Sequence, residues 1–227
     1  MRTKAIILKK QNTNEYDQLV TCYTEEFGKV TAIAKSVLKP SSIQAMHLDI
    51  FNLVDFELLN GRATPIITGA QAEQTFANLK NNLPSLATAY FFAEVIDKAA
   101  FDYQKDEELW NFIATLVGDL NTPQVPGSLA SGHKEFLIEK QVEFLNILGY
   151  APNFNECAFC SASLDGLLMA YSTEVKGGVC KNCFLSGQKG IVLKSNDWQT
   201  PAIIGALFEG LAEKKLNSLN FLNSMLR

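Results

Sequence analysis

Four of the five cysteines in this 227-residue chain form two Cys-x-x-Cys pairs, and they are the residues best suited to chemistry. Cys157 and Cys160 form the first pair, Cys180 and Cys183 form the second, and 19 residues separate the pairs. Each pair can hold two thiolates close to one ion, and two pairs complete a four-sulfur shell typical of structural Zn²⁺. Because four protein ligands leave no open coordination position, such an ion would stabilise the fold without activating water.

Three other uses of these thiols stay open beside zinc. Disulfides need an oxidising compartment, but the first apolar run, Ala5–Leu8, is much too short for a secretory signal or a membrane span. A redox site would need only one of the two pairs, whereas an iron–sulfur cluster would accept all four thiolates. The sequence favours structural zinc in a cytoplasmic protein. The fifth cysteine, Cys22, lies in the apolar run Leu19–Tyr23, and we expect it to be a buried free thiol.

Charge is unevenly distributed along the chain. The composition, 47% hydrophobic and 19% charged with a net charge of −4, is typical of a soluble globular protein. Residues 1–40 carry seven basic and four acidic side chains, which leaves 13 basic and 20 acidic side chains in the remainder. This asymmetry indicates one basic face near the N-terminus of an otherwise acidic protein. The alternative interpretation is a solvated strand face with scattered lysines.

Short β-branched runs separated by turn residues fill the first 70 positions. Asn60-Gly61 is a strong turn signal, and Phe27-Gly28-Lys29 forms another. Five antiparallel strands in this length predict a small barrel, with the OB-fold favoured over an SH3-like barrel. The expected strands are Lys4–Lys9, Leu19–Tyr23, Val30–Ala34, Ile50–Leu59 and Pro65–Thr68.

Helical periodicity follows the predicted barrel. The cysteine segment interrupts the helices and offers only short strands, at Thr173–Val179 and Ile191–Leu193. The fold class is therefore α+β: an N-terminal OB-fold domain (1–80), then a helical domain (81–227) that carries a zinc-binding insert (153–195). The expected helices are Ala70–Asn81, Leu83–Tyr103, Asp106–Leu120, Ser131–Leu148 with Gly149 as its C-cap, one starting at Thr200-Pro201, and Ala212–Arg227.

No arrangement of residues predicts catalysis. Gly127 and Gly132 have the spacing of a phosphate-binding loop, but His133 stands where that motif requires lysine. His47 and His133 have no partnering motif, and each is expected to be a surface residue or a satisfied polar group. A full metal shell also disfavours a zinc-dependent nuclease. We therefore expect a protein that is not an enzyme.

Several ordered stretches resemble the bacterial RecO family of recombination mediators. Asn14-Glu15-Tyr16-Asp17 and Thr24-Glu25-Glu26-Phe27-Gly28-Lys29 are similar to the opening of that family, and Ala32-Ile33-Ala34-Lys35 to the segment that follows. Leu148-Gly149-Tyr150-Ala151-Pro152 leads into the first cysteine pair, and Gly177-Gly178-Val179 into the second, as in the family's zinc site. Each motif alone is weak, but the ordered set is specific.

The resemblance implies a function in DNA repair and recombination. It implies binding of single- and double-stranded DNA, annealing of complementary strands, and help in loading the strand-exchange recombinase onto DNA coated with single-stranded DNA-binding protein (SSB). The implied partners are RecR and the acidic, apolar C-terminal tail of SSB, for which a basic-rimmed hydrophobic groove on the helical domain is expected. The implied location is the nucleoid. Without the resemblance, the alternative is a zinc-ribbon adaptor that binds a protein partner.

Basic side chains of the predicted barrel are the candidate DNA ligands. An OB-fold can follow a single strand with cations on the phosphates and aromatic rings on the bases. Tyr16, Tyr23 and Phe27 are possible stacking residues, although core or surface packing is the simpler interpretation of them. Lysines near the cysteines, including Lys181, are expected to balance an anionic metal centre. The predicted DNA-binding residues are Arg2, Lys4, Lys9, Lys10, Lys29, Lys35, Lys39 and Arg62.

Overall fold

The chain divides into two compact units. The computed structural model describes residues 1–59, 61, 64–122, 130–152, 154–165, 168–193, 199–213 and 215–225. The first unit contains Met1–His133 and Asn217–Arg227, and the second contains Lys134–Leu216. The first unit is thus completed by the end of the chain, while the predicted domain boundaries at 1–80, 81–227 and 153–195 stay a prediction.

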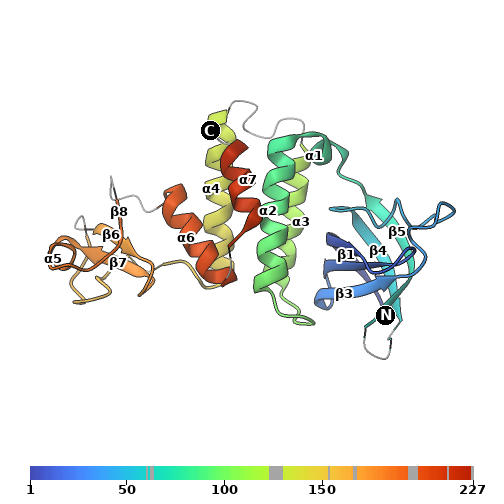
Figure 1. Cartoon of the computed structure of the whole chain (residues 1–227), viewed down its shortest axis with the longest axis horizontal. Coiled ribbons are helices and arrows are strands. Elements are labelled where there is room, and N and C mark those ends of the chain that lie inside the picture. The colour runs from blue at the N-terminus through green and yellow to red at the C-terminus, as the bar shows by residue number, and fades with distance from the viewer. Residues whose placement is uncertain are drawn as a thin grey trace. The chain divides into compact units, whose positions relative to one another are not determined.

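Five strands in the first unit form a closed barrel (Figure 1). They are β1 (Arg2–Asn12), β2 (Gln18–Thr24), β3 (Gly28–Ala34), β4 (Leu53–Leu59) and β5 (Ile66–Gln74), in the order β1-β2-β3-β5-β4. The barrel is the predicted OB-fold. One expectation was wrong: β3 and β5 pair in parallel, with Ile33 opposite Ile66, so the strands are not all antiparallel.

Alternating side chains fill the barrel. In β4, Val54, Phe56 and Leu58 are buried, whereas Asp55 and Glu57 point away from the core. Cys22 is a fully buried free cysteine, as predicted, and burial raises its pKa to about 12. This thiol is therefore kept in its neutral form.

Two expected elements of the barrel differ from the structure. Residues 70–74, expected to begin a helix, continue β5 and pair with β4. Helix-favouring alanine and glutamine are overridden there by the hydrogen bonds that the open edge of β4 supplies. Residues 50–52, expected in a strand, form a turn before β4 in which Phe51 has a φ of 62°.

Four helices complete the first unit: α1 (Ala77–Asn81), α2 (Leu83–Ala99), α3 (Glu107–Asn121) and α7 (Asn217–Met225). The side chain of Asn82 caps α2 by accepting from the N–H of Ser85, and Asp106 caps α3 by accepting from the N–H of Leu109. The helix predicted to reach Tyr103 ends at Ala99, and the following segment returns to the barrel. The N–H of Tyr103 donates there to the Lys29 carbonyl, at 2.9 Å.

The second unit holds most of α4 (Ala130–Ile147), a small sheet and α6 (Pro201–Ala212). Gly149 has a φ of 69°, and the N–H of Tyr150 donates to the Leu145 carbonyl, which confirms the predicted C-cap of α4. The helix expected from Ala212 to Arg227 is instead broken: α6 ends at Ala212, and Glu213 has a φ of 50°.

The small sheet has the order β7-β6-β8, and a short helix follows β7. Its elements are β6 (Leu168–Ser172), β7 (Gly177–Cys180), α5 (Lys181–Leu185) and β8 (Ile191–Val192). The strand expected over Thr173–Val179 is partly a turn, because the chain reverses between Ser172 and Gly177. Within the described ranges, no helix is both long enough and apolar enough to cross a membrane.

Candidate nucleic-acid interface and cysteine cluster

The sulfur atoms of Cys157, Cys160, Cys180 and Cys183 all lie within 4.8 Å of one another. Cys157 and Cys160 lie in a turn before β6, Cys180 ends β7, and Cys183 lies in α5. The two pairs predicted from the sequence therefore come together at one point. All four are free cysteines.

Two glycines allow the first cysteine turn to pack directly against β7. A Cβ atom at Gly177 would lie 2.9 Å from the Ala158 side chain, and one at Gly178 would lie 2.5 Å from Leu164. The N–H of Ala158 donates to the carbonyl of Gly178 at 2.9 Å. Small residues before Cys180 thus bring the two halves of the cluster together.

The sulfur spacing matches a tetrahedral metal shell. A Zn–S bond of about 2.3 Å gives sulfur–sulfur edges of about 3.8 Å in a regular tetrahedron. The Sγ atoms of Cys160 and Cys180 lie 3.8 Å apart, which is much longer than a disulfide bond. Four thiolate donors in a closed arrangement also fit the chemistry of Zn²⁺, and the shell would leave no position for a reacting water. The cluster could hold a metal ion.

The four thiols affect one another's pKa values. Burial would raise the pKa of Cys157, but N–H groups of Cys180, Phe159 and Cys160 lower it to about 6. A hydrogen bond with Cys160, together with burial, raises the pKa of Cys183 to about 12. One thiolate thus forms readily and disfavours the next, a situation that a bound cation would relieve.

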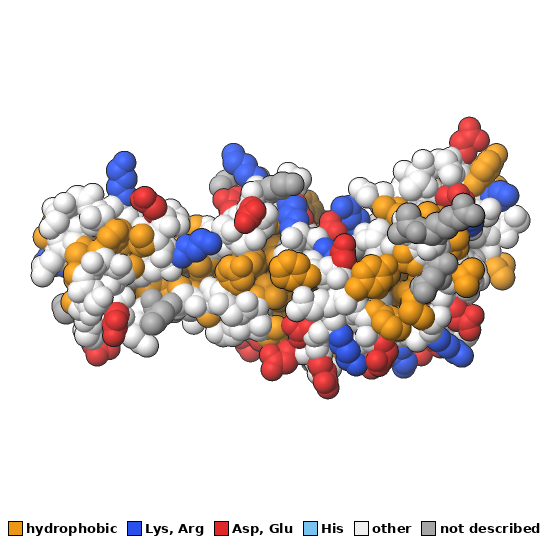
Figure 2. Space-filling view, turned by 90° about the horizontal axis from the view of Figure 1, so that it is seen from below, with side chains coloured by type: hydrophobic (Ala, Val, Ile, Leu, Met, Phe, Trp, Pro, Cys, Tyr) orange, Lys and Arg blue, Asp and Glu red, His pale blue; other side chains and the backbone are white. Residues whose placement is uncertain are grey.

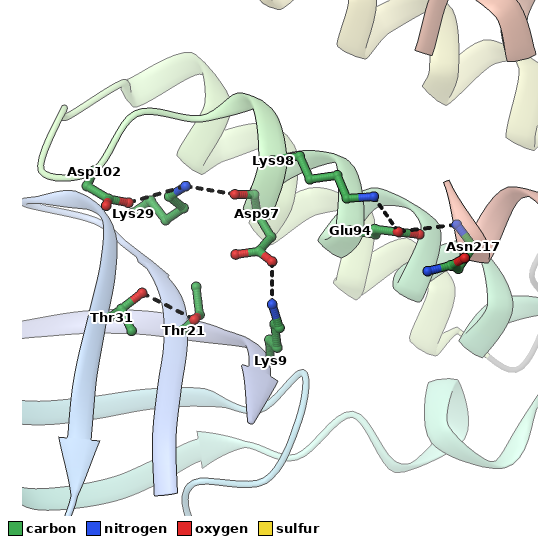
Figure 3. A network of polar contacts seen from close by, with 9 residues as sticks. All are labelled: Lys9, Thr21, Lys29, Thr31, Glu94, Asp97, Lys98, Asp102 and Asn217. Carbon is green, nitrogen blue, oxygen red and sulfur yellow. Dashed lines mark hydrogen bonds and ion pairs between the residues drawn. The ribbon is translucent and has the colours of Figure 1, made fainter. Parts of the chain in front are cut away.

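Three of the predicted DNA-binding cations lie at the junction between the barrel and α2 in the first unit. Lys29 is 9% exposed, and its Nζ donates to the Asp97 carbonyl at 2.8 Å and pairs with Asp102 at 3.2 Å (Figure 3). Lys9 pairs with the Asp97 carboxylate at 2.7 Å, as Figure 3 also shows. Lys10 lies 3.4 Å from Asp49. The structure thus places these cations against carboxylates of the same unit.

Two more predicted cations pair across the outside of the barrel. Arg2 donates to both carboxylate oxygens of Asp55, and Lys4 lies 2.9 Å from Glu73. The Arg2 hydrogen bond holds the pKa of Asp55 below its ordinary value. On the face in Figure 2, basic side chains lie among acidic ones over the barrel, at the right of the view. Arg62, also predicted, lies outside the described residues.

Lys35 and Lys39 differ from the other predicted cations. Within the described ranges, neither forms a direct ion pair with a carboxylate, although both lie near enough to Asp17 to help lower the pKa of its carboxyl group. Lys39 lies over the ring of Tyr16, with Nζ 5.2 Å from the ring centroid. Tyr16 is 50% exposed, whereas Tyr23 is 1% exposed and Phe27 packs against the barrel core. Of the three aromatic candidates, Tyr16 is therefore the one available for stacking.

A turn residue that the sequence analysis missed holds this region together. Asp17 accepts a hydrogen bond from the N–H of Ser36 at 2.6 Å and another from the Asn14 side chain at 3.0 Å. These donors hold the pKa of Asp17 below its ordinary value. The Asn14-x-x-Asp17 spacing is a turn signal that could have predicted the β1–β2 loop conformation. Lys35 and Tyr16 line the same shallow cavity of about 480 Å³ beside this turn.

Neither histidine takes part in these sites. Nε2 of His133 lies 3.0 Å from the Thr88 hydroxyl in the interior, and Nδ1 of His47 accepts from the N–H of Ala72. Both are satisfied polar groups, as predicted.

Comparison with known proteins identifies the family. The family models described as "Recombination protein O N terminal" and "Recombination protein O C terminal" match residues 1–76 and 80–221. A DNA repair protein RecO of Dehalococcoides mccartyi is 30% identical over 182 residues, covering 80% of this chain and 69% of the relative. A DNA repair protein RecO of Desulfitobacterium hafniense is 27% identical over 219 residues, covering 95% of this chain and 75% of the relative. With matches along nearly its whole length, this chain belongs to the RecO family of DNA repair proteins.

Proposed function

We propose that this protein binds single- and double-stranded DNA, anneals complementary strands and, with RecR, helps to load the strand-exchange recombinase onto SSB-coated DNA. The observation that carries the proposal is the group formed by Tyr16, Lys35 and Lys39, which we call the open cation patch. It combines an exposed aromatic ring on an OB-fold with two lysines that form no direct ion pair within the described ranges, although the Asp17 carboxylate lies near both. OB-folds bind single strands with such groups.

Annealing on this patch requires no covalent chemistry. Two DNA strands repel each other through their phosphates, and a cation that neutralises phosphates lowers that barrier. Lys9 and Lys29 are already neutralised by Asp97 and Asp102, so contacts with DNA there would have to compete with existing ion pairs. We therefore assign the phosphate contacts first to Lys35 and Lys39.

The salt dependence of single-strand binding tests this assignment. Each phosphate contact contributes about 0.7 to the slope of log affinity against log salt, so Lys35→Gln with Lys39→Gln should lower the slope by about 1.4. The matched control is Lys4→Gln with Lys105→Gln, which removes two exposed charges that are paired with Glu73 and Glu26. The control should change the slope by much less. An unchanged slope in the Lys35/Lys39 variant would place the DNA site elsewhere, and absence of binding by the parent protein would favour the protein-adaptor alternative.

The cysteine cluster has a supporting role in the proposal. We propose that Cys157, Cys160, Cys180 and Cys183 hold one structural Zn²⁺, on the grounds of the 3.8 Å sulfur spacing and the closed donor set. Because, among the described residues, the apolar cluster around the cysteines contains only Leu164 and the partly buried Leu168 besides the cysteines themselves, metal binding would supply much of the free energy that orders this segment. The protein then acts through non-covalent contacts and is not an enzyme.

A cleft in the second unit has the chemistry expected of a site for the SSB tail. It has a volume of about 220 Å³ between the end of α4, β6 and α6. Apolar side chains line it, and Lys176 stands at its edge as the cation among its lining residues. An acidic and apolar peptide could place its carboxylates by Lys176 and its apolar groups in the cleft. Binding partners of this kind would keep the protein with the DNA of the nucleoid, in the cytoplasm.

A further inference from the structure

The segment between β3 and β4 exposes apolar side chains beside the open cation patch. Ile43 is 80% exposed and Met46 is 71% exposed, and Leu38 is also partly exposed. We call residues 36–52 the apolar loop. Scattered exposed hydrophobic residues are common, but several on one ordered segment beside cations that form no direct ion pair indicate a binding surface.

The apolar loop is firmly anchored. Leu48 and Phe51 are buried, and the side-chain amide of Asn52 donates to the carbonyls of Met46 and His47 at 3.1 and 3.0 Å. The side-chain amide of Gln44 donates to the Thr68 carbonyl at 3.2 Å, between the two exposed residues. Ile43 and Met46 are thus held outward by a fixed backbone, and their exposure does not result from a lack of local packing.

Hydrogen bonds connect the apolar loop to the open cation patch. The N–H of Leu38 donates to the carbonyl of Tyr16 at 2.9 Å. The N–H of Ser42 donates to the carbonyl of Lys39 at 2.9 Å, which closes a turn directly before Ile43. Cations, an aromatic ring and aliphatic side chains therefore lie on directly connected segments of the barrel.

The order of these groups matches the chemistry of an unpaired nucleic-acid strand. Such a strand carries phosphates that pair with cations, and its unstacked bases offer apolar faces. In duplex DNA the base faces are covered by stacking, so aliphatic side chains reach them only by separating base steps. An anionic partner is favoured by the two lysines, which form no direct ion pair in the part of the chain that the structure describes and have only the Asp17 carboxylate near both of them.

We propose that Ile43 and Met46 form a hydrophobic platform for unstacked bases of single-stranded DNA, while Lys35 and Lys39 bind the adjoining phosphates. This inference rests on the proposed DNA-binding function and deepens it. Bases held on the platform are kept from stacking within their own strand and stay available for a complementary strand. The platform thereby favours single strands over duplexes and promotes annealing.

The test combines Ile43→Ser with Met46→Ser and measures binding of an oligonucleotide that carries 2-aminopurine, whose fluorescence rises when it is unstacked. We expect affinity for the single strand to fall about tenfold, equivalent to roughly 1.4 kcal/mol. The fluorescence rise should shrink with it. The salt slope should be unchanged, because apolar contacts release no counterions. Affinity for duplex DNA should be unchanged.

Two further variants sharpen the result. Leu185→Ser is the matched control, because it removes an apolar side chain that is 72% exposed in α5 and should leave all four readouts unchanged. Ile43→Trp offers a larger stacking surface, so it should bind single strands more tightly, with its indole fluorescence quenched by the bases. Tighter binding by this variant would be a gain of function, which loss of folding cannot produce, so it complements the loss expected for the serine variant.

Several outcomes would overturn the platform. Parent-like affinity and 2-aminopurine fluorescence in the serine variant would show that bases do not contact these residues. An altered oligomeric state, or lost binding to RecR, with DNA binding intact would assign the loop to a protein contact. If the parent protein failed to bind single strands even at low salt, the proposed function itself would fall, and the platform with it.

Discussion

At the scale of single residues, Gly28 is a tightly constrained position in the barrel. It has a φ of +66°, and a Cβ atom there would lie 1.9 Å from the backbone oxygen of Gln104. The turn between β2 and β3 thus contacts the segment that follows α2 without room for a side chain. Its neighbour Lys29 pairs with the exposed Asp102 at the same junction.

Gly28→Ala should therefore destabilise the protein severely. Both the left-handed backbone and the close approach oppose the methyl group, and together they should cost about 2 kcal/mol or more. Urea unfolding measures the change. Gly118→Ala is the control, since a Cβ atom there meets nothing within 4 Å and alanine favours helix interiors. Equal urea midpoints of unfolding for Gly28→Ala and Gly118→Ala would show that the protein does not maintain the close contact between Gly28 and Gln104.

The sequence could predict which residues are cationic but not which cations are free. Lys9, Lys29 and Lys35 all lie in or next to predicted strands of the barrel, so the local sequence does not distinguish them. All three were predicted to bind DNA. Their carboxylate partners Asp97 and Asp102 lie more than 60 positions away in the sequence, so only tertiary structure reveals the pairs. The four candidate metal ligands were easier to predict from the sequence, because a Cys-x-x-Cys turn brings its two thiols together through local geometry.

At the scale of elements, we propose that the cysteine module, residues 154–193 around the four clustered cysteines, would depend on a bound metal ion for its fold. Cys180→Ser should abolish binding of one zinc per chain and lower the melting temperature, because the small sheet then loses its main source of folding free energy. Metal content and calorimetry of the purified protein measure the two effects. A variant that binds no zinc but melts like the parent would contradict the structural role.

Cys22→Ala is the control for this experiment. Cys22 is buried in the barrel and is not one of the four clustered thiols, so its loss should leave the zinc content unchanged. It should destabilise only the barrel, through the small cavity that remains.

The carboxylate of Glu94 in α2 forms hydrogen bonds with the start of helix α7. Glu94 accepts from the N–H groups of Asn217 and Ser218 and pairs with Lys98 (Figure 3). Burial would raise the pKa of Glu94, but hydrogen bonds from Lys98, Ser218 and Asn217 lower it from 4.5 to about 2. A negative charge at the start of α7 is also favoured by the helix dipole.

Stability should depend on pH through this carboxylate. Since the pKa is depressed in the folded state, the contribution is complete above about pH 4.5 and is lost as pH falls towards 2. Glu94→Gln should therefore lower stability at neutral pH and flatten the acid limb of a plot of stability against pH. The same acid limb in parent and variant would exclude this role for Glu94.

The predictions of secondary structure were wrong where strand pairing competes with the local preference of the residues for a helix. Residues 70–74 contain helix-favouring alanine and glutamine, yet they form the second half of β5 because β4 offers an open edge. The parallel pairing of β3 with β5 joins segments that are distant in sequence, which periodicity does not encode. Hairpin strands and the Gly149 cap were predictable because their signals are local.

At the scale of the whole molecule, the chain leaves its first unit at His133 and returns to it at Asn217. No sequence signal announced this return, because α7 is recognised only through its packing on α2. The cysteine module and the cleft beside α6 therefore belong to a segment that both begins and ends at the first unit.

The electrostatics of the molecule limit how DNA can bind. The net charge is −4, and five of the eight predicted cations are paired with acidic residues. A small open patch on a largely neutralised surface predicts weak binding with a shallow salt dependence, because two phosphate contacts contribute a slope of only about 1.4. Strands held in this way can be released after pairing, which suits an annealing role.

Chemical footprinting of the lysines tests the central claim most directly. The protein would be acetylated with and without single-stranded DNA, and each lysine would be quantified by mass spectrometry. We predict that DNA protects Lys35 and Lys39, while the ion-paired Lys4 and Lys105 keep their reactivity. Unchanged acetylation of Lys35 and Lys39 in a DNA-saturated sample would contradict the account.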